Sequence, residues 1–164
     1  MYSIGDLIVY PMHGAGVIEA IEVKEVLGVL RKYYIMKLPL DDMMVMIPLD
    51  SAEDIGIRRV VLPKIIKEVI TALAEDETTG SQNWNRRYRA NIDKIKTGNI
   101  FEVTEVVRNL ILRDREKSLS TGERKILNNA KQVLLSEIIL VSGILEEDAK
   151  KLVEDAVKGE LLKG

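Results

Sequence analysis

The chain has 164 residues and a net charge of −2, and its 46% apolar and 30% charged residues are ordinary for a globular protein. It contains no cysteine, which excludes disulfides, thiolate metal sites and thiol nucleophiles. No apolar run reaches the roughly 18 residues of a membrane-spanning helix, and the N-terminal residues do not resemble a signal peptide, so we expect a cytoplasmic protein.

The first part of the chain, up to about residue 62, predicts short β-strands. Runs rich in β-branched and apolar residues are separated by Gly, Pro and Asp, which is typical of strands joined by turns. We expect strands over residues 6–10, 17–23, 29–38 and 43–47, with a hairpin turn at Gly28. Such a series predicts a small barrel or a strongly bent sheet.

From Pro63 onward the apolar residues recur at helical spacing, which predicts five helices. N-cap signals mark three of the helix starts: Ser81, Asn99 with Glu102, and Ser120 with Glu123. We expect the second helix to stop at Gly98 and the last to span residues 146–158. The predicted fold class is therefore α+β, with a β domain over residues 1–62 and a compact helical domain over residues 63–164.

The only tryptophan, Trp84, lies in the run Asn83-Trp84-Asn85-Arg86-Arg87-Tyr88-Arg89. On a helical wheel Trp84 shares a face with Tyr88, Ile92 and Ile95, which is the pattern of a core stripe. Trp84 also falls in the first helical turn, where a side chain can project beyond the helix end and backbone N–H groups are free for phosphate. The sequence leaves both interpretations open: a packed ring, or a ring that inserts against a base step.

Positive charge surrounds this tryptophan. Residues 84–131 hold 12 basic and 6 acidic residues in a chain that is otherwise acidic, which indicates a single surface for a polyanion. On the second interpretation Arg86, Arg87 and Arg89 hold the flanking phosphates. The remaining basic residues of the block, including Arg124, are more typical of a solvated helix face with i,i+4 ion pairs.

No residue pattern indicates an enzyme, a metal site or a cofactor. His13 has no cysteine or carboxylate cluster beside it, and Asp41-Asp42 is typical of a turn. Gly14-Ala15-Gly16 lacks the third glycine and the helix of a dinucleotide-binding motif. We therefore predict a non-enzymatic protein without a small-molecule substrate.

Several stretches resemble the CarD/CdnL family of bacterial transcription regulators. Residues 5–18, Gly-Asp-Leu-Ile-Val-Tyr-Pro-Met-His-Gly-Ala-Gly-Val-Ile, resemble the family's G-D-x-V-V-Y-P-x-H-G-x-G signature, and Met46-Ile47-Pro48 with Gly56-Ile57-Arg58 resembles the end of the same domain. Residues 83–91 resemble the motif N-W-x-R-R-Y-[KR]-x-N. Residues 105–110 and 119–124 resemble two further family stretches, so the resemblance covers nearly the whole chain in order.

The resemblance implies a fold and a function. The N-terminal domain would be a Tudor/SH3-like barrel that docks on the β-subunit lobe of RNA polymerase, as a similar module does in transcription-repair coupling factor. The helical domain would contact promoter DNA at the upstream fork of the melted bubble. There Trp84 would wedge into the minor groove and stabilise the open complex, with Arg86, Arg87, Arg89 and Arg124 as DNA contacts.

The polymerase-facing edge departs from the family pattern. Two arginines are common there, and the matching positions are Lys24 and Met46. Lys24 keeps the charge without the bidentate guanidinium, and Met46 loses the charge, so docking would rely on strand pairing and on Val26 as an apolar contact. Two alternatives remain. One is a protein–protein adaptor of the transcription machinery without DNA contact, and the other is a hydrolase, which no pattern of catalytic residue types supports.

Overall fold

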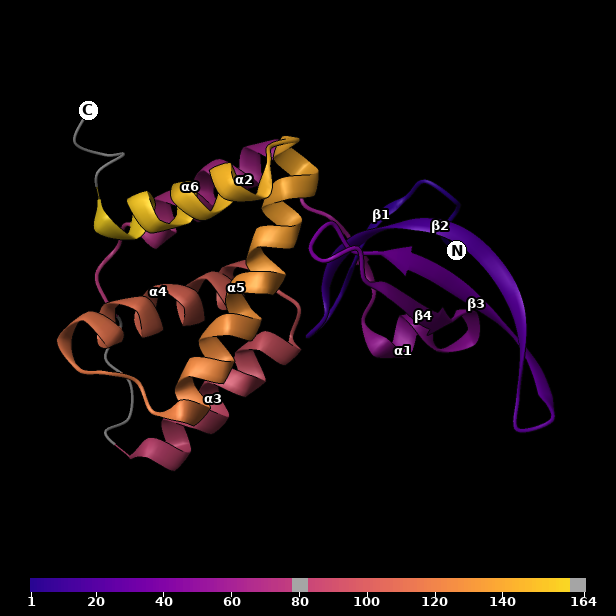
Figure 1. Ribbon diagram of the computed structural model, residues 1–164, viewed down its shortest axis with the longest axis horizontal. Helices are drawn as coiled ribbons and strands as arrows, with labels where there is room; N and C mark the ends of the chain where they lie inside the picture. Colours follow the sequence, from indigo (N-terminus) through magenta and orange to yellow (C-terminus); the bar gives the residue numbers. More distant parts are fainter. Residues whose placement is uncertain (78–82, 160–164) are drawn as a thin grey trace.

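The computed structural model describes residues 1–77 and 83–159 and has two parts that lie side by side along its long axis (Figure 1). The first part is a five-stranded antiparallel sheet, and the second is a group of packed helices. The predicted α+β class is therefore confirmed. Within the two described ranges, no helix is long and apolar enough to cross a membrane.

The sheet has the strand order β4-β3-β2-β1-β5. Its strands are β1 (Leu7–Tyr10), β2 (Gly14–Val26), β3 (Val29–Lys37), β4 (Met44–Pro48) and β5 (Arg58–Arg59). The four predicted strands are confirmed, although β2 is longer than predicted. A 3-10 turn (Leu49–Ser51), helix α1 (Ala52–Ile55) and β5 were not predicted, because each is only two to four residues long. In addition, β5 depends on its pairing with the distant strand β1.

The β2–β3 hairpin extends beyond the rest of the sheet. Leu27 and Gly28 form its turn with φ of 53° and 78°, and two consecutive positive φ angles suit the twist of a tight hairpin. β1 pairs with β2 only as far as Val17, whereas the β2–β3 pairing continues to Val26↔Val29. The Ile18 backbone still bonds to Gly5 and Asp6, and beyond Ile18 the outer edge of β2 is open within the described sheet.

One face of the sheet covers a small apolar core. Tyr34 and Ile47 are cross-strand partners in β3 and β4, so their side chains share this face. The residues of this core that are almost fully buried are Ile8, Ile18, Tyr34, Met36 and Ile47.

The second part contains the five predicted helices. They are α2 (Pro63–Leu73), α3 (Trp84–Lys96), α4 (Ile100–Glu116), α5 (Thr121–Ser142) and α6 (Glu146–Lys158). Asn99 and Ser120 cap α4 and α5 as predicted. The predicted cap Ser81 lies outside the described residues. Asn83 caps α3 instead, because its side chain accepts a hydrogen bond from the Arg86 amide at 3.2 Å, so α3 begins later than predicted.

The two parts meet where α5 packs against β2 (Figure 1). The Ala15 amide donates to Ser136 Oγ at 2.8 Å. Gly14 has φ of 117°, and a Cβ there would lie 2.7 Å from Ser136 Oγ, so both backbone and space require glycine. Leu40 of the sheet part is buried in the core of the helical part. The division between domains at residue 62 therefore stays a prediction.

An ion pair between a partly buried arginine and a buried glutamate reinforces this contact. Arg58 donates from both terminal nitrogens to the Glu137 carboxylate, each at 2.8 Å, and Glu137 is only 2% exposed. Arg58 also donates to the Gly98 carbonyl at 2.8 and 3.0 Å, and the Val61 amide donates to Glu137 at 2.9 Å. This group, the Arg58–Glu137 junction, fastens β5 to α5 and to the α3–α4 turn.

Candidate nucleic-acid interface

Trp84 lies at the first residue of α3 and its side chain is 42% exposed. The ring stacks on Tyr88 with a centroid distance of 5.0 Å and an interplanar angle of 23°. Its Nε1 donates to Ser120 Oγ at 3.2 Å. The later residues of the predicted stripe pack inward, with Ile95 buried, but the tryptophan at its start is not part of the core.

The start of α3 lies beside the start of α5. In Figure 1 both N-terminal ends are found at the lower end of the helical part. The contact between Trp84 and Ser120 joins residues 36 positions apart. Because Ser120 also accepts from the Glu123 amide at 3.2 Å, the ring is fixed to the capping residue of α5.

The three arginines beside Trp84 do not share one environment. Arg87 points to α5 and donates to Glu123 at 2.9 and 3.3 Å, and its side chain is 14% exposed. Arg86 and Arg89 are exposed, and neither takes part in an ion pair among the described residues. At about 100° per residue they lie on the side of α3 opposite Trp84. A DNA contact by Arg87 stays a prediction that requires its ion pair to open.

Much of the basic block is engaged internally. Arg108 is buried and donates to the Ala72 carbonyl at 3.0 Å, while Arg113 lies 3.7 Å from Glu123. Arg124, in the first turn of α5, pairs with Asp114 at 3.2 Å and keeps a half-exposed side chain. The surface for a polyanion is therefore smaller than the net charge of residues 84–131 indicates.

The three residues predicted to face the polymerase lie on one face of the sheet. Lys24 and Val26 are alternate residues of β2, opposite Arg31 and Val29 of β3, and Met46 lies opposite Ile35. Partners across antiparallel strands point to the same side, so all three project away from the sheet core. We name Lys24, Val26 and Met46 the docking face.

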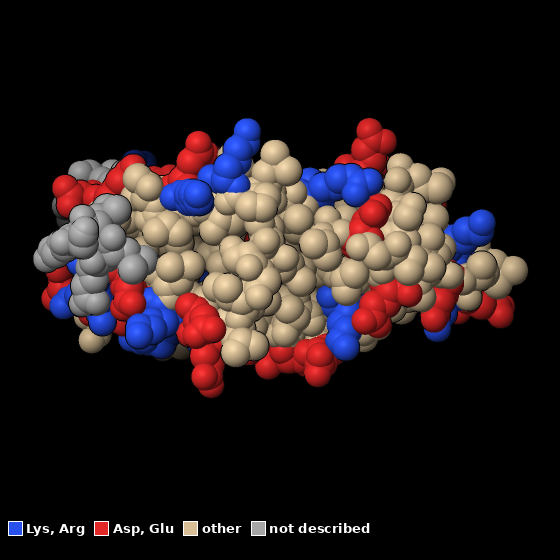
Figure 2. Space-filling model, turned by 90° about the horizontal axis from the view of Figure 1, so that it is seen from above, with Lys and Arg blue, Asp and Glu red and all other residues tan. Residues whose placement is uncertain are grey.

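The docking face is apolar in character and electrostatically weak. Val26 and Met46 are 45% and 43% exposed, and Lys24 pairs with Glu22 at 3.0 Å. Met46 belongs to β4, which is an edge strand. In Figure 2 the protruding hairpin, at the right end, has an uncharged tip flanked by charges of both signs. This combination suits strand pairing with apolar contacts better than charge recognition.

An exposed ion pair lies beside this face. Arg31 donates to Asp50 at 2.6 Å, and this hydrogen bond lowers the pKa of Asp50 and raises that of Arg31. At the other end of the sheet, a hydrogen bond from the Ser3 amide lowers the pKa of Asp6. Both carboxylates are therefore held in the charged form at neutral pH.

The remaining candidate residues, His13, Asp41 and Asp42, lie in packing or turn positions. His13 packs edge-on against Tyr10 with a centroid distance of 4.3 Å. Asp41 and Asp42 have φ of 60° and 49°, as expected of turn residues. Among the residues that the structure describes, no group of three or more His, Cys, Asp or Glu side chains could hold a metal ion.

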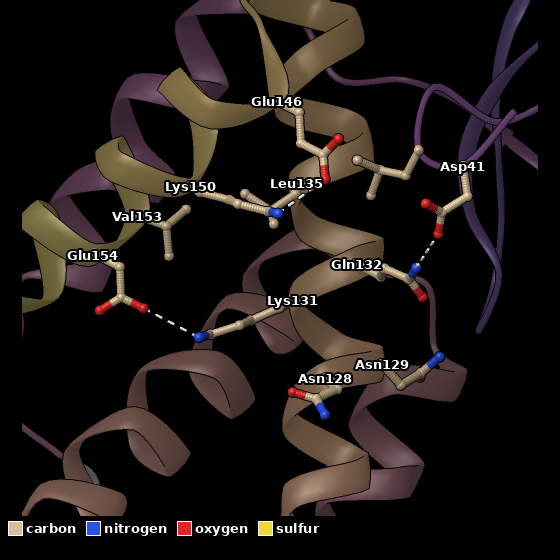
Figure 3. A pocket seen from close by; sticks show the side chains of 11 residues that line it. Asp41, Asn128, Asn129, Lys131, Gln132, Leu135, Glu146, Lys150, Val153 and Glu154 are labelled. Atoms are coloured by element: carbon tan, nitrogen blue, oxygen red, sulfur yellow. Dashed lines mark hydrogen bonds and ion pairs between the residues drawn. The ribbon is translucent and has the colours of Figure 1, made fainter.

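A cleft of about 670 Å³ lies between α5, α6 and the loop before β4 (Figure 3). Four of its charged side chains form two ion pairs: Lys131 with Glu154 at 3.1 Å, and Lys150 with Glu146 at 3.0 Å. Asp41 instead accepts a hydrogen bond from Gln132 at 3.5 Å. The Oδ1 atom of Asn129 is buried in its wall without a hydrogen-bond partner in the described structure. No set of unpaired charges converges on the cleft, so its chemistry does not indicate a particular ligand.

Comparison with known proteins matches both parts of the chain. The family model described as the CarD-like/TRCF RID domain matches residues 2–61, and that described as the CarD C-terminal domain matches residues 68–154. YdeB of Bacillus subtilis (strain 168), whose name proposes a transcription-factor role, is 43% identical over 150 residues, which cover 92% of this chain and 98% of that protein. The solution structure of the 72-residue N-terminal domain of Myxococcus xanthus CarD is 36% identical, covers 36% of this chain and 79% of that chain, and has a TM-score of 0.32.

The two family models and the Bacillus subtilis relative, together with a sheet joined to a helical part, define a transcription regulator whose role is tied to RNA polymerase. The chain belongs to the CarD family, and the resemblance that the sequence motifs indicate is confirmed.

The sequence patterns did not identify two residues that contact the tryptophan, Ser120 and Gly122. Both stand in the stretch Ser120-Thr121-Gly122-Glu123, which was interpreted only as a capping box. The available signal was Gly122 itself, because glycine has a lower helix propensity than alanine.

Proposed function

We propose that this protein docks on the β-subunit lobe of RNA polymerase through its docking face and stabilises the promoter open complex with Trp84. The ring would wedge into the minor groove at the upstream fork of the bubble and hinder reannealing. Arg86 and Arg89 would hold nearby phosphates, with Arg87 and Arg124 as further contacts at the same end of the helical part.

One observation supports the DNA part of this proposal: the ring of Trp84 is large and half-exposed, and contacts with Tyr88 and Ser120 fix its position. An exposed aromatic ring is normally mobile, but this one is stacked on Tyr88 and hydrogen-bonded to Ser120. A ring that is already ordered loses little conformational entropy when it inserts against a base step. The positive end of the α3 helix dipole adds a favourable environment for phosphate.

The weak charge of the protein supports a tethered mode of action. The net charge is −2, and few arginines are available for phosphate contacts, so binding to free DNA should be weak and sensitive to salt. Docking on the polymerase would raise the effective concentration of Trp84 near the fork. A differential affinity of a few kcal/mol for the open promoter then shifts the balance between open and closed complexes.

The DNA part is tested by Trp84→Ala in an open-complex lifetime assay with RNA polymerase. A stacked ring contributes about 1–3 kcal/mol, so the lifetime added by the protein should fall roughly 5- to 150-fold. Phe101→Ala is the matched control, because Phe101 is also an aromatic residue of a first helical turn and is 41% exposed. A Trp84→Ala variant that folds, still binds the polymerase and prolongs the open complex as much as the unchanged protein would contradict the wedge role of Trp84. That result would favour the protein–protein adaptor without DNA contact.

The docking part is tested by a pull-down with the isolated β lobe. Val26→Glu and Met46→Glu place a charge on the docking face and should each weaken binding at least about tenfold, since a buried unpaired charge is costly. Phe101→Glu makes the same change at a similarly exposed site on α4 and should bind like the unchanged protein. Undiminished binding by both docking-face variants would show that another surface is used.

A further inference from the structure

The start of α5 makes two separate contacts with the ring of Trp84. Ser120 Oγ accepts the indole N–H at 3.2 Å and accepts the Glu123 amide at the same distance. One hydroxyl therefore caps α5 and fixes the edge of the ring that carries its only hydrogen-bonding group.

Gly122 leaves the space that the ring occupies. A Cβ at this position would lie 3.3 Å from Trp84 Cζ2, which is tighter than most Cβ contacts, and 3.4 Å from Tyr88 Cε2, at the limit of ordinary van der Waals contact. Gly122 is the second residue of α5, and glycine is less favourable there than alanine. The contact with the two rings gives a reason for a residue that helix propensity alone does not explain.

The neighbouring ion pair holds α3 against α5. Arg87 lies three residues after Trp84, and its guanidinium binds Glu123, which directly follows Gly122. The rings on one side and the ion pair on the other join the same two helix starts. The direction of the Trp84 ring is therefore set by α5 rather than by α3 alone.

We propose that Ser120 and Gly122 are positioning residues for Trp84, which present the ring to DNA with its N–H group already engaged. This inference rests on the proposed function of Trp84 as a wedge. It adds that the ring contacts a base step by shape and apolar surface. The indole N–H does not donate to the minor-groove acceptors of the bases, so Trp84 would not select bases by hydrogen bonding.

The experiment uses three full-length variants with RNA polymerase. Ser120→Gly removes the acceptor for the indole N–H, and glycine remains an acceptable N-cap. Ser120→Thr keeps the hydroxyl and serves as the conservative rescue. Gly122→Ala adds one methyl group against the ring and improves helix propensity.

Two measurements are compared for each variant. Trp84 is the only tryptophan, so its emission and its quenching by acrylamide report directly on the ring. We expect both Ser120→Gly and Gly122→Ala to change the two fluorescence signals. Ser120→Gly should shorten the added open-complex lifetime roughly two- to tenfold, in line with the loss of one hydrogen bond. Gly122→Ala should also shorten it, because the added methyl group displaces the ring. Thermal unfolding should show folded protein throughout, and Ser120→Thr should stay close to the unchanged protein in both measurements.

The outcomes separate this inference from the proposed function. If Trp84→Ala shortens the lifetime but neither Ser120→Gly nor Gly122→Ala does, the positioning role is overturned and the wedge stands. If Trp84→Ala has no effect on the lifetime, both are overturned, even where the fluorescence of the variants changes. A Ser120→Thr variant as defective as Ser120→Gly would also contradict the role of the hydroxyl.

Discussion

The two surfaces proposed for contact are built in opposite ways. The docking face comes from neighbouring strands, and strand alternation alone points Lys24, Val26 and Met46 to one side. The surface around Trp84 needs residues from two helices, because Ser120 and Gly122 lie more than 35 positions along the chain. The docking face follows from strand pairing, and the surface around Trp84 follows from the packing of two helices. Substitutions at the two surfaces should therefore change the free energy of unfolding by different amounts.

Their charged groups differ in the same way. Beside the docking face, the pairs Lys24–Glu22 and Arg31–Asp50 are exposed to solvent. Beside Trp84 and at the contact between the parts, Glu123 and Glu137 are each 2% exposed. Exposed pairs contribute little to stability, whereas the removal of one partner of a buried pair leaves an uncompensated charge.

The largest effect is expected at the Arg58–Glu137 junction. Glu137→Ala should lower the free energy of unfolding by about 3–5 kcal/mol, because Arg58 and the Val61 amide lose a shared acceptor in a buried site. Denaturant unfolding measures this change. Glu22→Ala, which removes an exposed pair, is the control, and an equal loss in both variants would contradict the distinction between the two kinds of pair.

A smaller loss is expected at Glu123. Glu123→Ala removes charged hydrogen bonds to Arg87 and the nearby charge for Arg113, and should cost about 1.5–3 kcal/mol. Because α3 is then less firmly held to α5, the fluorescence of Trp84 should also change. A destabilised variant with unchanged Trp84 emission would show that the ring does not depend on this ion pair.

Substitutions on the docking face should hardly change stability. Val26→Ser and Met46→Gln should each alter the free energy of unfolding by no more than about 0.5 kcal/mol, since these side chains contribute little to the sheet core. Thermal unfolding is sufficient to measure this. A loss as large as that of Glu123→Ala would mean that the docking face, too, is maintained by packing.

The smallest effect is expected from Asp50 and should depend on pH. Its pKa is lower in the folded protein because of Arg31, so its contribution to stability is present above the ordinary carboxyl pKa of about 3.9. That contribution is lost as the pH falls through the lower folded-state value. The difference in denaturant midpoint between the unchanged protein and Asp50→Asn should therefore be small at pH 7 and shrink below about pH 4. A difference that grows with acid would contradict this assignment.

The sequence predicted those features that depend on local patterns. Strand alternation and helical spacing identified β1 to β4 and α2 to α6, and the caps at Asn99 and Ser120 followed from residue type. The family was also identified from short motifs. These features can be predicted without knowing which distant residues are in contact.

The features that the sequence did not predict depend on contacts between residues that lie far apart in the chain. β5 has two residues and exists only because it pairs with β1. The carboxylate of Glu123, expected to complete a capping box, binds Arg87 instead, because α3 brings a partly buried guanidinium to it. Periodicity placed Trp84 in a core stripe, and only the position of α5 shows that its ring lies at the edge of that core.

The Arg58–Glu137 junction has a consequence for how the molecule loses its structure. The smaller sheet part cannot come apart without removing the partners of Glu137 inside the larger part. We therefore expect both parts to melt together in one cooperative transition rather than one after the other. For the same reason the Val61 amide, although it lies in a connecting segment, should exchange its hydrogen with solvent as slowly as the buried amides of α5.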